Sequence, residues 1–374
     1  MKKILLIIVT MFLVLPFNSI DALDLATNAS SVMVLEPTTG EIIYERNSHE
    51  RRPPASMTKI MTMLLVMESI ENNIISWEDI VTVSANASSM GGSQILLETN
   101  EQMSVYDLFK GLAVASGNDA AVALAEKVAG TEENFVEMMN KKAKELGLVD
   151  TNFKNCHGLD EANHYSSAYD MAIMAKELTK HEKVFEFTSI YEDYLRKGTD
   201  RSFWLVNTNK LVRFYNGVDG LKTGYTSEAG FCITATAKIN DMRIITVVMG
   251  EPDTKTRNSD VTSVFDYVYA QYSLNKIVDK NTVLQTIEIP NAKVQNVDII
   301  AKEDISDLYK KSDGATDVTY EIKLDEIKLP VQKGDVVGKL TLSDGRSVDL
   351  TVKEDVKKAN IFEVYYRYLK KVIN

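Results

Sequence analysis

The stretch that decides the fold is PASMTKIMTMLLVM, residues 54–67. It begins at the second of two prolines, which interrupt the preceding chain, and continues as an almost unbroken apolar run. A helix that is apolar nearly all round has to be buried on every side. The stretch therefore predicts a helix at the centre of a domain, with the polar residues Ser56 and Lys59 at its beginning.

Ser56 and Lys59 are three residues apart, so a helix places them on one face about one turn from each other. A serine hydroxyl is a weak nucleophile without an adjacent base. A lysine amine serves as that base when burial lowers its pKa, and a helix N-terminus favours negative charge developing nearby. The pair predicts a serine hydrolase with Ser56 as nucleophile and Lys59 as base, although this spacing alone is a weak signal.

Two further short motifs strengthen the prediction of an active site. Ser116, Gly117 and Asn118 lie in a sharp break between two predicted helices, where side chains can converge on a cleft. The segment 222–224 reads Lys-Thr-Gly before a predicted strand, and its small residues allow a ligand to approach the backbone. The three motifs together predict one cleft.

The chain around these motifs alternates between strand and helix signals. Two hairpins are expected, one from residues 31–35 and 41–46 and one from residues 230–238 and 242–249. Helices are expected at residues 106–114, 120–128, 133–146, 167–178 and 258–273, and Ser167 with Asp170 resembles a capping box. Strands at both ends with helices between them predict an α/β (α+β) domain with a mainly antiparallel sheet, over residues 23–276.

The sequence pattern changes near residue 280, where short strand-like runs separated by turn signals dominate. These runs are 283–289, 294–300, 318–324, 336–342 and 347–352. They predict a second, smaller all-β domain over residues 277–353.

Residues 1–22 have the features of a secretory signal peptide. Lys2 and Lys3 precede an apolar run, and Ala22 is a small residue suited to cleavage. The run is shorter than the about 20 residues that a membrane span needs, and an uncleaved anchor is the alternative. We therefore expect an exported protein, at the outer face of the cytoplasmic membrane or in the cell-wall space.

The C-terminal segment 354–374 predicts an amphipathic helix. Ile361, Tyr365, Tyr368, Leu369 and Val372 recur at helical spacing, and residues 357–374 carry five basic residues and one glutamate. Such a helix can lie in a membrane interface. A helix docked on the β domain is an equally good interpretation of the pattern.

Composition excludes several classes of function. The net charge is −11, and no basic stripe with interleaved aromatic residues is present, so we expect no nucleic-acid partner. The four histidines are too scattered to suggest metal-ligand spacing, and we expect no metal or other cofactor. Cys156 and Cys232 can form one disulfide arithmetically, but two buried thiols are the simpler interpretation.

The motifs closely resemble those of low-molecular-mass penicillin-binding proteins of the D-alanyl-D-alanine carboxypeptidase family. The resemblance rests on residues 54–62, 116–118 and 218–226, and on two flanking stretches, 155–159 and 207–211. It covers roughly residues 25 to 275 by motif. The predicted signal peptide, second β domain and amphipathic tail also match the family's usual layout.

The resemblance implies a role for each motif residue. Ser56 would attack the penultimate D-alanine of a cell-wall stem peptide, Lys59 would take its proton, and Ser116 would relay a proton to the leaving amine. The residues implied to bind substrate are Asn118, Lys222, Thr223, Gly224 and Tyr225, with the backbone N–H groups of Ser56 and Tyr225 forming the oxyanion hole. Arg257 is a further candidate for binding the substrate carboxylate, and a solvated helix-terminal arginine is the alternative interpretation.

The resemblance also narrows the reaction. β-Lactams would acylate Ser56, and Gly117 stands where class A β-lactamases have an aspartate, so slow deacylation of penicillin is implied. The expected activity is removal of the terminal D-alanine of peptidoglycan stem pentapeptides. A D,D-endopeptidase that cleaves peptidoglycan cross-links is the alternative on the same scaffold, and a non-catalytic wall-binding protein is a more distant one. His157 near Asp160 does not favour a Ser-His-Asp triad, because Lys59 already supplies a base.

Overall fold

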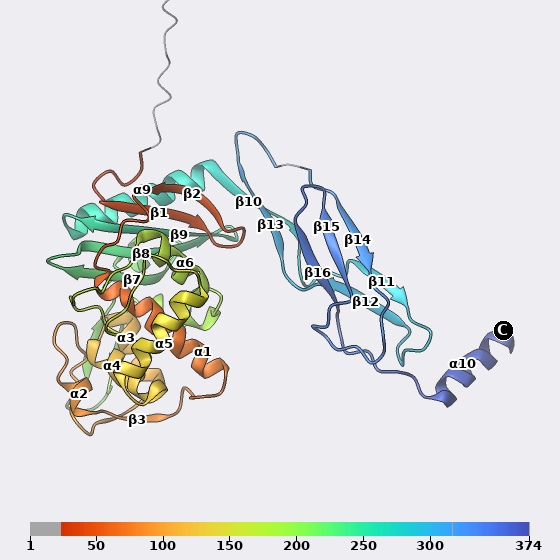
Figure 1. Cartoon of the computed structure of the whole chain (residues 1–374), viewed down its shortest axis with the longest axis horizontal. Helices are drawn as coiled ribbons and strands as arrows, with labels where there is room; N and C mark the ends of the chain where they lie inside the picture. Colours follow the sequence, from red (N-terminus) through yellow and green to blue (C-terminus); the bar gives the residue numbers. More distant parts are fainter. Residues whose placement is uncertain (1–23, 316, 374) are drawn as a thin grey trace, which may run out of the picture.

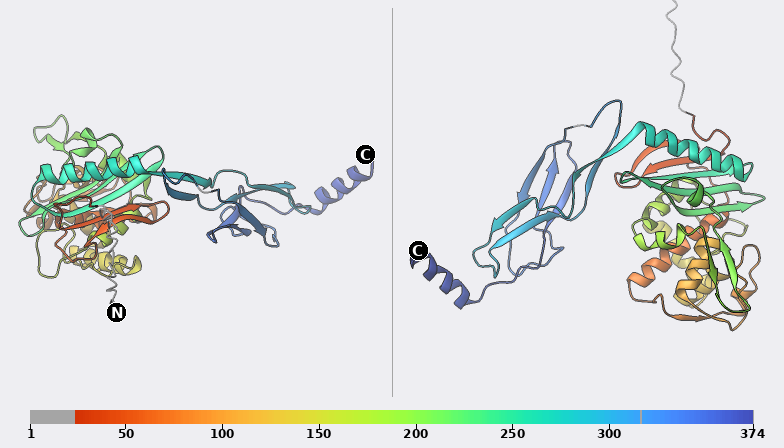
Figure 2. Two further views of the ribbon diagram at one scale, coloured as in Figure 1. Left: turned by 90° about the horizontal axis from the view of Figure 1, so that it is seen from above. Right: turned by 180° about the vertical axis from the view of Figure 1, so that it is seen from behind.

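The computed structural model describes residues 24–315 and 317–373, so the predicted signal peptide lies outside the described residues. Figure 1 shows a larger part built of a sheet and helices, a second part built of strands, and a helix at the C-terminal end. Figure 2 shows that this helix, α10 (Ile361–Ile373), lies at the end of the molecule away from the first part.

The sheet of the first part has the strand order β2-β1-β9-β8-β7, and every neighbouring pair is antiparallel. Its strands are β1 (Ser31–Glu36), β2 (Glu41–Arg46), β7 (Val218–Thr226), β8 (Gly230–Ile239) and β9 (Met242–Glu251). Both predicted hairpins, β1–β2 and β8–β9, are confirmed. β7 is an edge strand, which leaves one side of residues 222–225 open to a ligand.

Helices cover both faces of this sheet (Figure 1). Their bounds are η1 (Ala55–Thr58), α1 (Lys59–Glu71), α2 (Ala85–Ser88), α3 (Val105–Ala115), α4 (Asn118–Ala129), α5 (Glu132–Glu145), α6 (Ala168–Leu178), η2 (Glu182–Val184), α7 (Phe185–Thr188), α8 (Leu211–Phe214) and α9 (Thr254–Gln271). Two short pairs of strands complete this part: β3 (Ile80–Thr82) with β4 (Gln102–Ser104), and β5 (Glu192–Leu195) with β6 (Phe203–Val206).

Successive side chains of the central strands contribute to two different hydrophobic cores, one on each face of the sheet. In β1, Val32 and Val34 belong to the core that includes α9, whereas Met33 and Leu35 belong to the core that includes α1. Side chains of a strand point alternately to the two faces, which explains why all six residues of β1 are buried.

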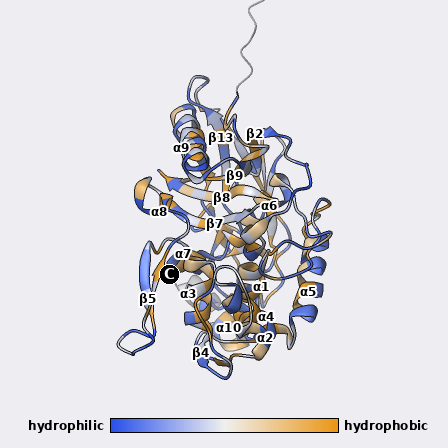
Figure 3. Cartoon of the chain, turned by 90° about the vertical axis from the view of Figure 1, so that its left-hand side faces the viewer, coloured by the Kyte–Doolittle hydropathy of each residue, from blue (hydrophilic) through white to orange (hydrophobic). Residues whose placement is uncertain are grey.

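α1 is the centre of the second of these cores, as its apolar sequence predicts. Its residues 59–67 are all buried. α5, by contrast, buries only Phe135, Met139 and Ala143, and Figure 3 shows hydrophilic and hydrophobic segments alternating along it. Ser167 caps α6 by accepting a hydrogen bond from the Asp170 N–H, which confirms the predicted helix start.

The second part contains a five-stranded antiparallel sheet with the order β11-β12-β16-β15-β14 and its own apolar core. The strands are β11 (Gln285–Glu288), β12 (Asn296–Ala301), β14 (Tyr320–Leu324), β15 (Gly338–Leu342) and β16 (Ser347–Val352). Each of these strands overlaps one predicted run.

Two strands between the parts were not predicted. β10 (Tyr272–Val278) pairs with β13 (Ile305–Lys310) directly after α9, so the boundary predicted after residue 276 falls inside a strand. Most residues of β10 are half-buried, and Lys276 interrupts the alternation of apolar and polar residues that its first four positions begin. The helix predicted to reach Ser273 ends at Gln271.

The packing of α9 on the sheet predicts a large effect of truncating Phe265. This side chain is fully buried between Tyr215 and Tyr269. We expect Phe265→Ala to lower the free energy of unfolding of the first part by about 3–5 kcal/mol. Urea unfolding followed by tryptophan fluorescence measures this, because Trp77 and Trp204 both lie in that part.

The matched control is Phe362→Ala in α10, where the ring is 80% exposed. We expect this change to move the same unfolding transition by less than about 0.5 kcal/mol. Equal effects of the two substitutions would contradict the assignment of Phe265 to the core.

Candidate active site

Ser56 lies at the N-terminal end of the central helix, in the 3-10 turn η1 that leads into α1. The preceding residue, Ala55, has a φ of 47°, which is uncommon for a residue with a Cβ and occurs where surrounding structure enforces it. This turn leaves Ser56 partly exposed while its neighbours are buried. Ser56 is therefore accessible from outside, although the turn that carries it is packed into the core.

Lys59 is fully buried and lies next to the serine. Its Nζ is 3.0 Å from the Ser56 Oγ, 2.6 Å from the Asn118 Oδ1 and 2.6 Å from the His157 carbonyl oxygen. Burial lowers the pKa of Lys59 to about 7, against weaker opposing effects of Cys156 and Asp119. A large share of the amine is therefore unprotonated at neutral pH and able to accept the Ser56 proton.

The break between α3 and α4 brings Ser116 and Asn118 to the same place. Ser116 ends α3 in the left-handed conformation, with a φ of 63°. Its buried Oγ has no hydrogen-bond partner among the described residues, so this hydroxyl is available to a ligand. The Asn118 side chain accepts from Lys59 and donates to the Gly91 carbonyl at 2.7 Å, which fixes the orientation of its amide.

β7 forms the opposite wall of the cleft. A Cβ added to Gly224 would lie 2.8 Å from the Pro54 carbonyl oxygen and 3.2 Å from the Met57 nitrogen. Only glycine allows the strand to approach the serine turn this closely. The next residue, Tyr225, is exposed, and its ring packs on that of Phe231 in a tilted arrangement with ring centroids 4.3 Å apart.

Lys222 and Thr223 are buried in the same strand. The Lys222 Nζ donates to the Thr223 carbonyl at 3.0 Å and makes no ion pair among the described residues. Burial, then the charges of Lys59 and Arg257, hold the pKa of Lys222 well below its usual range. An anionic ligand would reverse this effect, because an opposite charge favours the ammonium form.

Arg257 is buried, with 3% of its surface exposed, so the alternative of a solvated arginine at a helix end is wrong. Its guanidinium contacts the Asn258 Oδ1 and, at 3.4 Å, the carbonyl oxygen of Cys232. Cys232 pairs with Gly224 across the sheet, which places Arg257 behind the wall formed by β7.

The loop at residues 155–158 contributes contacts that the sequence analysis did not assign. The His157 carbonyl accepts from Lys59, and Asn155 shapes the loop by accepting from the N–H groups of His157 and Gly158. A Cβ at Gly158 would collide with the Ala55 carbonyl, so this glycine is needed for the loop to reach the serine turn. The flanking stretch quoted for the resemblance was the only signal for these roles, because a backbone carbonyl leaves no mark on residue type.

His157 itself does not act as a base for Ser56. Burial, then the charge of Lys59, lowers the pKa of His157 to about 3, so the ring is neutral. Its Nδ1 accepts from the Leu159 N–H, and its Nε2 lies 3.5 Å from a carboxylate oxygen of Glu132. These contacts support the loop and do not reach the serine.

Other features of the described residues lie apart from this chemistry. Cys156 and Cys232 are buried free thiols, so they do not pair. The residues that the structure describes contain no cluster of histidine, cysteine, aspartate or glutamate arranged to hold a metal ion. A hollow of about 500 Å³ lies beside the serine turn, between residues 51–55 and 158–165.

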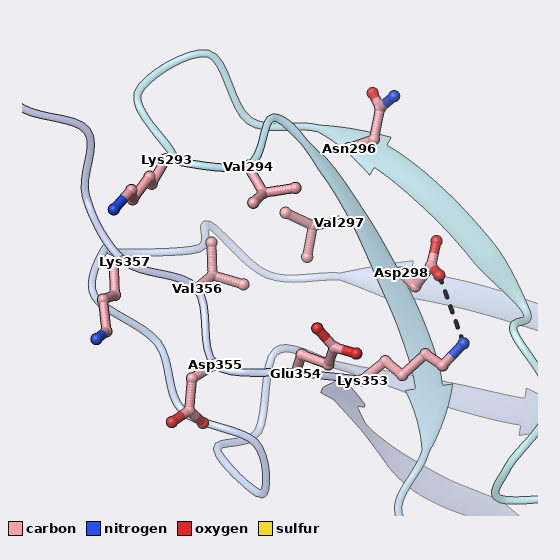
Figure 4. Close-up of a pocket in the computed structure, with 10 residues that line it drawn as sticks. All are labelled: Lys293, Val294, Asn296, Val297, Asp298, Lys353, Glu354, Asp355, Val356 and Lys357. Carbon is pink, nitrogen blue, oxygen red and sulfur yellow. Dashed lines mark ion pairs between the residues drawn. The ribbon is translucent and has the colours of Figure 1, made fainter. Parts of the chain in front are cut away.

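A second hollow, of about 230 Å³, lies in the strand-built part (Figure 4). Val294, Val297 and Val356 lie near one another there, and charged side chains of both signs surround them, including the Lys353–Asp298 ion pair. It shares no residue with the cleft at Ser56.

Comparisons with known proteins identify the class of this site. Residues 18–253 match the family described as D-alanyl-D-alanine carboxypeptidase, and residues 272–358 match the family described as penicillin-binding protein 5, C-terminal domain. The chain belongs to the D-alanyl-D-alanine carboxypeptidase family.

Individual relatives extend the similarity over most of the chain. D-alanyl-D-alanine carboxypeptidase DacF of Bacillus subtilis is 51% identical over 341 residues, which cover 90% of this chain and 88% of the relative. The crystal structure of penicillin binding protein 5 from Haemophilus influenzae is 32% identical, with a TM-score of 0.71, and the match covers 90% of this chain and 99% of that one. Penicillin-Binding Protein D2 from Listeria monocytogenes, solved in an ampicillin-bound form, is 32% identical with a TM-score of 0.58, covering 66% of this chain and 98% of that one.

The lowered pKa of Lys59 predicts how acylation of Ser56 depends on pH. If the unprotonated amine is the base, the rate of labelling by fluorescent penicillin should rise about tenfold per pH unit below pH 7 and level off above it. The rate of labelling, measured between pH 5 and pH 8, checks this.

Lys59→Arg is the matched variant, because a guanidinium keeps the positive charge and cannot release its proton in this range. We expect its labelling rate to fall by at least about a hundredfold at every pH. A flat profile for the unaltered chain, or rapid labelling of the variant, would rule out Lys59 as the base.

Proposed function

We propose that this chain is a serine-type D-alanyl-D-alanine carboxypeptidase that removes the terminal D-alanine from peptidoglycan stem pentapeptides. The observation that carries the proposal is the 3.0 Å contact between Ser56 Oγ and the buried amine of Lys59, whose pKa is about 7. The family match over both parts of the chain supports the substrate class.

The first step is acylation. Ser56 Oγ bonds to the carbonyl carbon of the penultimate D-alanine as its proton passes to Lys59. The backbone N–H groups of Ser56 and Tyr225 would stabilise the oxyanion, a contribution of about 3 kcal/mol for each donor. The carbon–nitrogen bond then breaks, and the proton that Lys59 took from Ser56 passes through Ser116, whose unpartnered Oγ is available for this relay, to the leaving amine of the terminal D-alanine.

The second step is hydrolysis of the acyl-enzyme. Water attacks the ester carbon as its proton passes to Lys59, and Lys59 returns this proton to Ser56 Oγ as the carbon–oxygen bond of the ester breaks. Asn118 binds Lys59 at 2.6 Å and so keeps the amine aimed at the reacting oxygen in both steps. β-Lactams would acylate Ser56 in the same way.

Two cationic residues would recognise the substrate: Lys222, which lies in β7, and Arg257, which lies behind this strand. Lys222 and Arg257 lie near enough for the charge of Arg257 to lower the Lys222 pKa. A terminal carboxylate bound at Thr223 relieves this repulsion, which makes a C-terminal peptide end the favoured ligand.

The reaction itself predicts which substrate is cleaved. The purified chain should release D-alanine from a free stem pentapeptide, and Ser56→Ala should reduce this by at least about 10⁴-fold. Mass spectrometry of an ampicillin adduct should map the added mass to Ser56. Cleavage of a cross-linked dimer without any release from the pentapeptide would instead favour the D,D-endopeptidase alternative.

We further propose that the chain acts outside the cytoplasmic membrane, held at its surface by α10. No helix in the described ranges is long and apolar enough to cross a bilayer. Five apolar side chains of α10 are 40–80% exposed: Ile361, Phe362, Tyr365, Tyr366 and Leu369. That exposure favours a membrane-associating helix over a helix docked on the β domain.

The attachment of α10 to the strand-built part fits this role. Arg367 donates to the carbonyl oxygens of Ala292 and Lys293 at 2.8 and 2.7 Å, whereas the apolar side chains remain uncovered. Asn360 and Glu363 cap the start of the helix by exchanging hydrogen bonds. The helix is therefore a fixed extension of the second part.

Truncation after Asn360 tests this attachment, because it keeps Val356 and Ala359, which are buried in the second part. We expect the full chain without its signal segment to float with vesicles containing anionic lipid, and the truncated chain to remain in solution. The double variant Phe362→Ser and Tyr366→Ser should weaken flotation while leaving D-alanine release unchanged. Equal flotation of the full and truncated chains would favour a docked helix.

A further inference from the structure

Glu251 is a buried carboxyl group that the proposed reaction does not use. It is the last residue of β9, is 1% exposed, and pairs with Phe231 of β8. No N–H group or hydroxyl of the described residues donates a hydrogen bond to either of its carboxyl oxygens. Burying an unpaired carboxylate is costly, so a group in this position is expected to hold its proton.

The surroundings of Glu251 explain why it stays protonated. The groups near enough to interact electrostatically with it are Asp260 and Arg257 of α9, Arg46 of β2 and Cys232 of β8. Burial, then the neighbouring Asp260 carboxylate, raises the pKa of Glu251 to about 8, and the two arginines oppose this only in part. Asp260 is itself held by Asn28, whose side chain donates to both carboxylate oxygens at 3.2–3.4 Å.

Arg257 is the cation that this arrangement affects. It makes no ion pair with any carboxylate in the described part of the chain, although it is buried and within electrostatic reach of Glu251. An uncompensated buried cation is unfavourable, and it becomes useful when a ligand supplies the missing anion. An ionised Glu251 would supply that anion from within the protein and compete with the ligand.

We propose that Glu251 and Asp260 form a carboxyl pair in which Glu251 carries the proton, and that this proton keeps Arg257 available to the terminal carboxylate of the substrate. Glu251 is then a positioning residue that acts through Arg257. Loss of its proton draws the guanidinium charge toward β9 and weakens substrate binding without altering Ser56 or Lys59. The inference rests on the proposed function, and its consequence is an alkaline limit on substrate affinity.

Steady-state release of D-alanine from a stem pentapeptide between pH 6.5 and pH 9.5 tests the proposal. For the unaltered chain, KM should rise roughly fivefold between pH 8 and pH 9, as for one group titrating near pH 8, while kcat stays level. Glu251→Gln should abolish this rise and keep the neutral-pH KM within about twofold. Asp260→Asn removes the carboxylate that favours the protonated form, so the rise should move to lower pH.

Thermal unfolding of the same variants separates this role from a structural one. The pKa of Glu251 is about 8 in the folded chain and 4.5 as its ordinary value. Its contribution to stability is therefore fully present below about pH 4.5 and is lost as pH rises through 8. If Glu251 has a purely structural role, the difference in Tm between Glu251→Gln and the unaltered chain should depend on pH. The dependence of KM on pH should then be the same for both proteins.

Two results would overturn the proposal in different ways. If D-alanine is released but Glu251→Gln keeps the alkaline rise in KM, the carboxyl pair does not control Arg257. If no D-alanine is released at any pH, the proposed function fails, and this inference fails with it.

Discussion

The structure of the first part depends on one constraint, which is keeping the Lys59 amine out of water without giving it a carboxylate partner. Desolvation lowers a lysine pKa, and a paired carboxylate would cancel the effect. The three groups that contact the amine are a hydroxyl, an amide oxygen and a backbone carbonyl, all neutral. The nearby carboxylate of Asp119 instead accepts the backbone N–H groups of Ile95, Leu97 and Ala120. The all-round burial of α1, the loop at 155–158 and the start of α4 all serve this constraint.

The cleft also concentrates positive charge within a chain whose net charge is −11. Lys59, Lys222 and Arg257 are buried, and the charges of Lys59 and Arg257 lower the pKa of Lys222. This repulsion is present while the site holds no ligand, and the negative charge of a peptide C-terminus would offset it. Under the proposed function, the site would gain selectivity for a terminal carboxylate from charges that are unfavourable in the protein without ligand. The proposed proton on Glu251 contributes to the same balance of charges, because a protonated Glu251 carries no negative charge that could neutralise Arg257.

Residue patterns could predict the architecture because they are set by burial. The apolar run after Ser56, the two hairpins and the strands of the second part all lie where the periodicity indicates. β10 and β13 escaped prediction because neither keeps a regular alternation along its length: Lys276 interrupts it in β10, and β13 buries the neighbouring Ile305 and Ser306. In the site, Ser56, Lys59, Ser116 and Lys222 could be named from motifs, whereas the His157 carbonyl and the burial of Arg257 could not. Any residue type can offer a backbone carbonyl, so the sequence does not reveal which carbonyl contacts Lys59. Whether an arginine is buried depends on how strands and a helix that are far apart in sequence pack together.

Gly158 and Gly224 limit which positions around the active site can be substituted during evolution. Each lies against the serine turn with no room for a side chain, so their replacement disturbs the catalytic geometry itself. Tyr225 and Leu159 stand beside these glycines in sequence, and both are exposed. Variation in ligand preference, including altered response to antibiotics, is therefore better tolerated at this exposed rim than in the framework. The catalytic framework and the rim can thus diverge at different rates although they are adjacent in the chain.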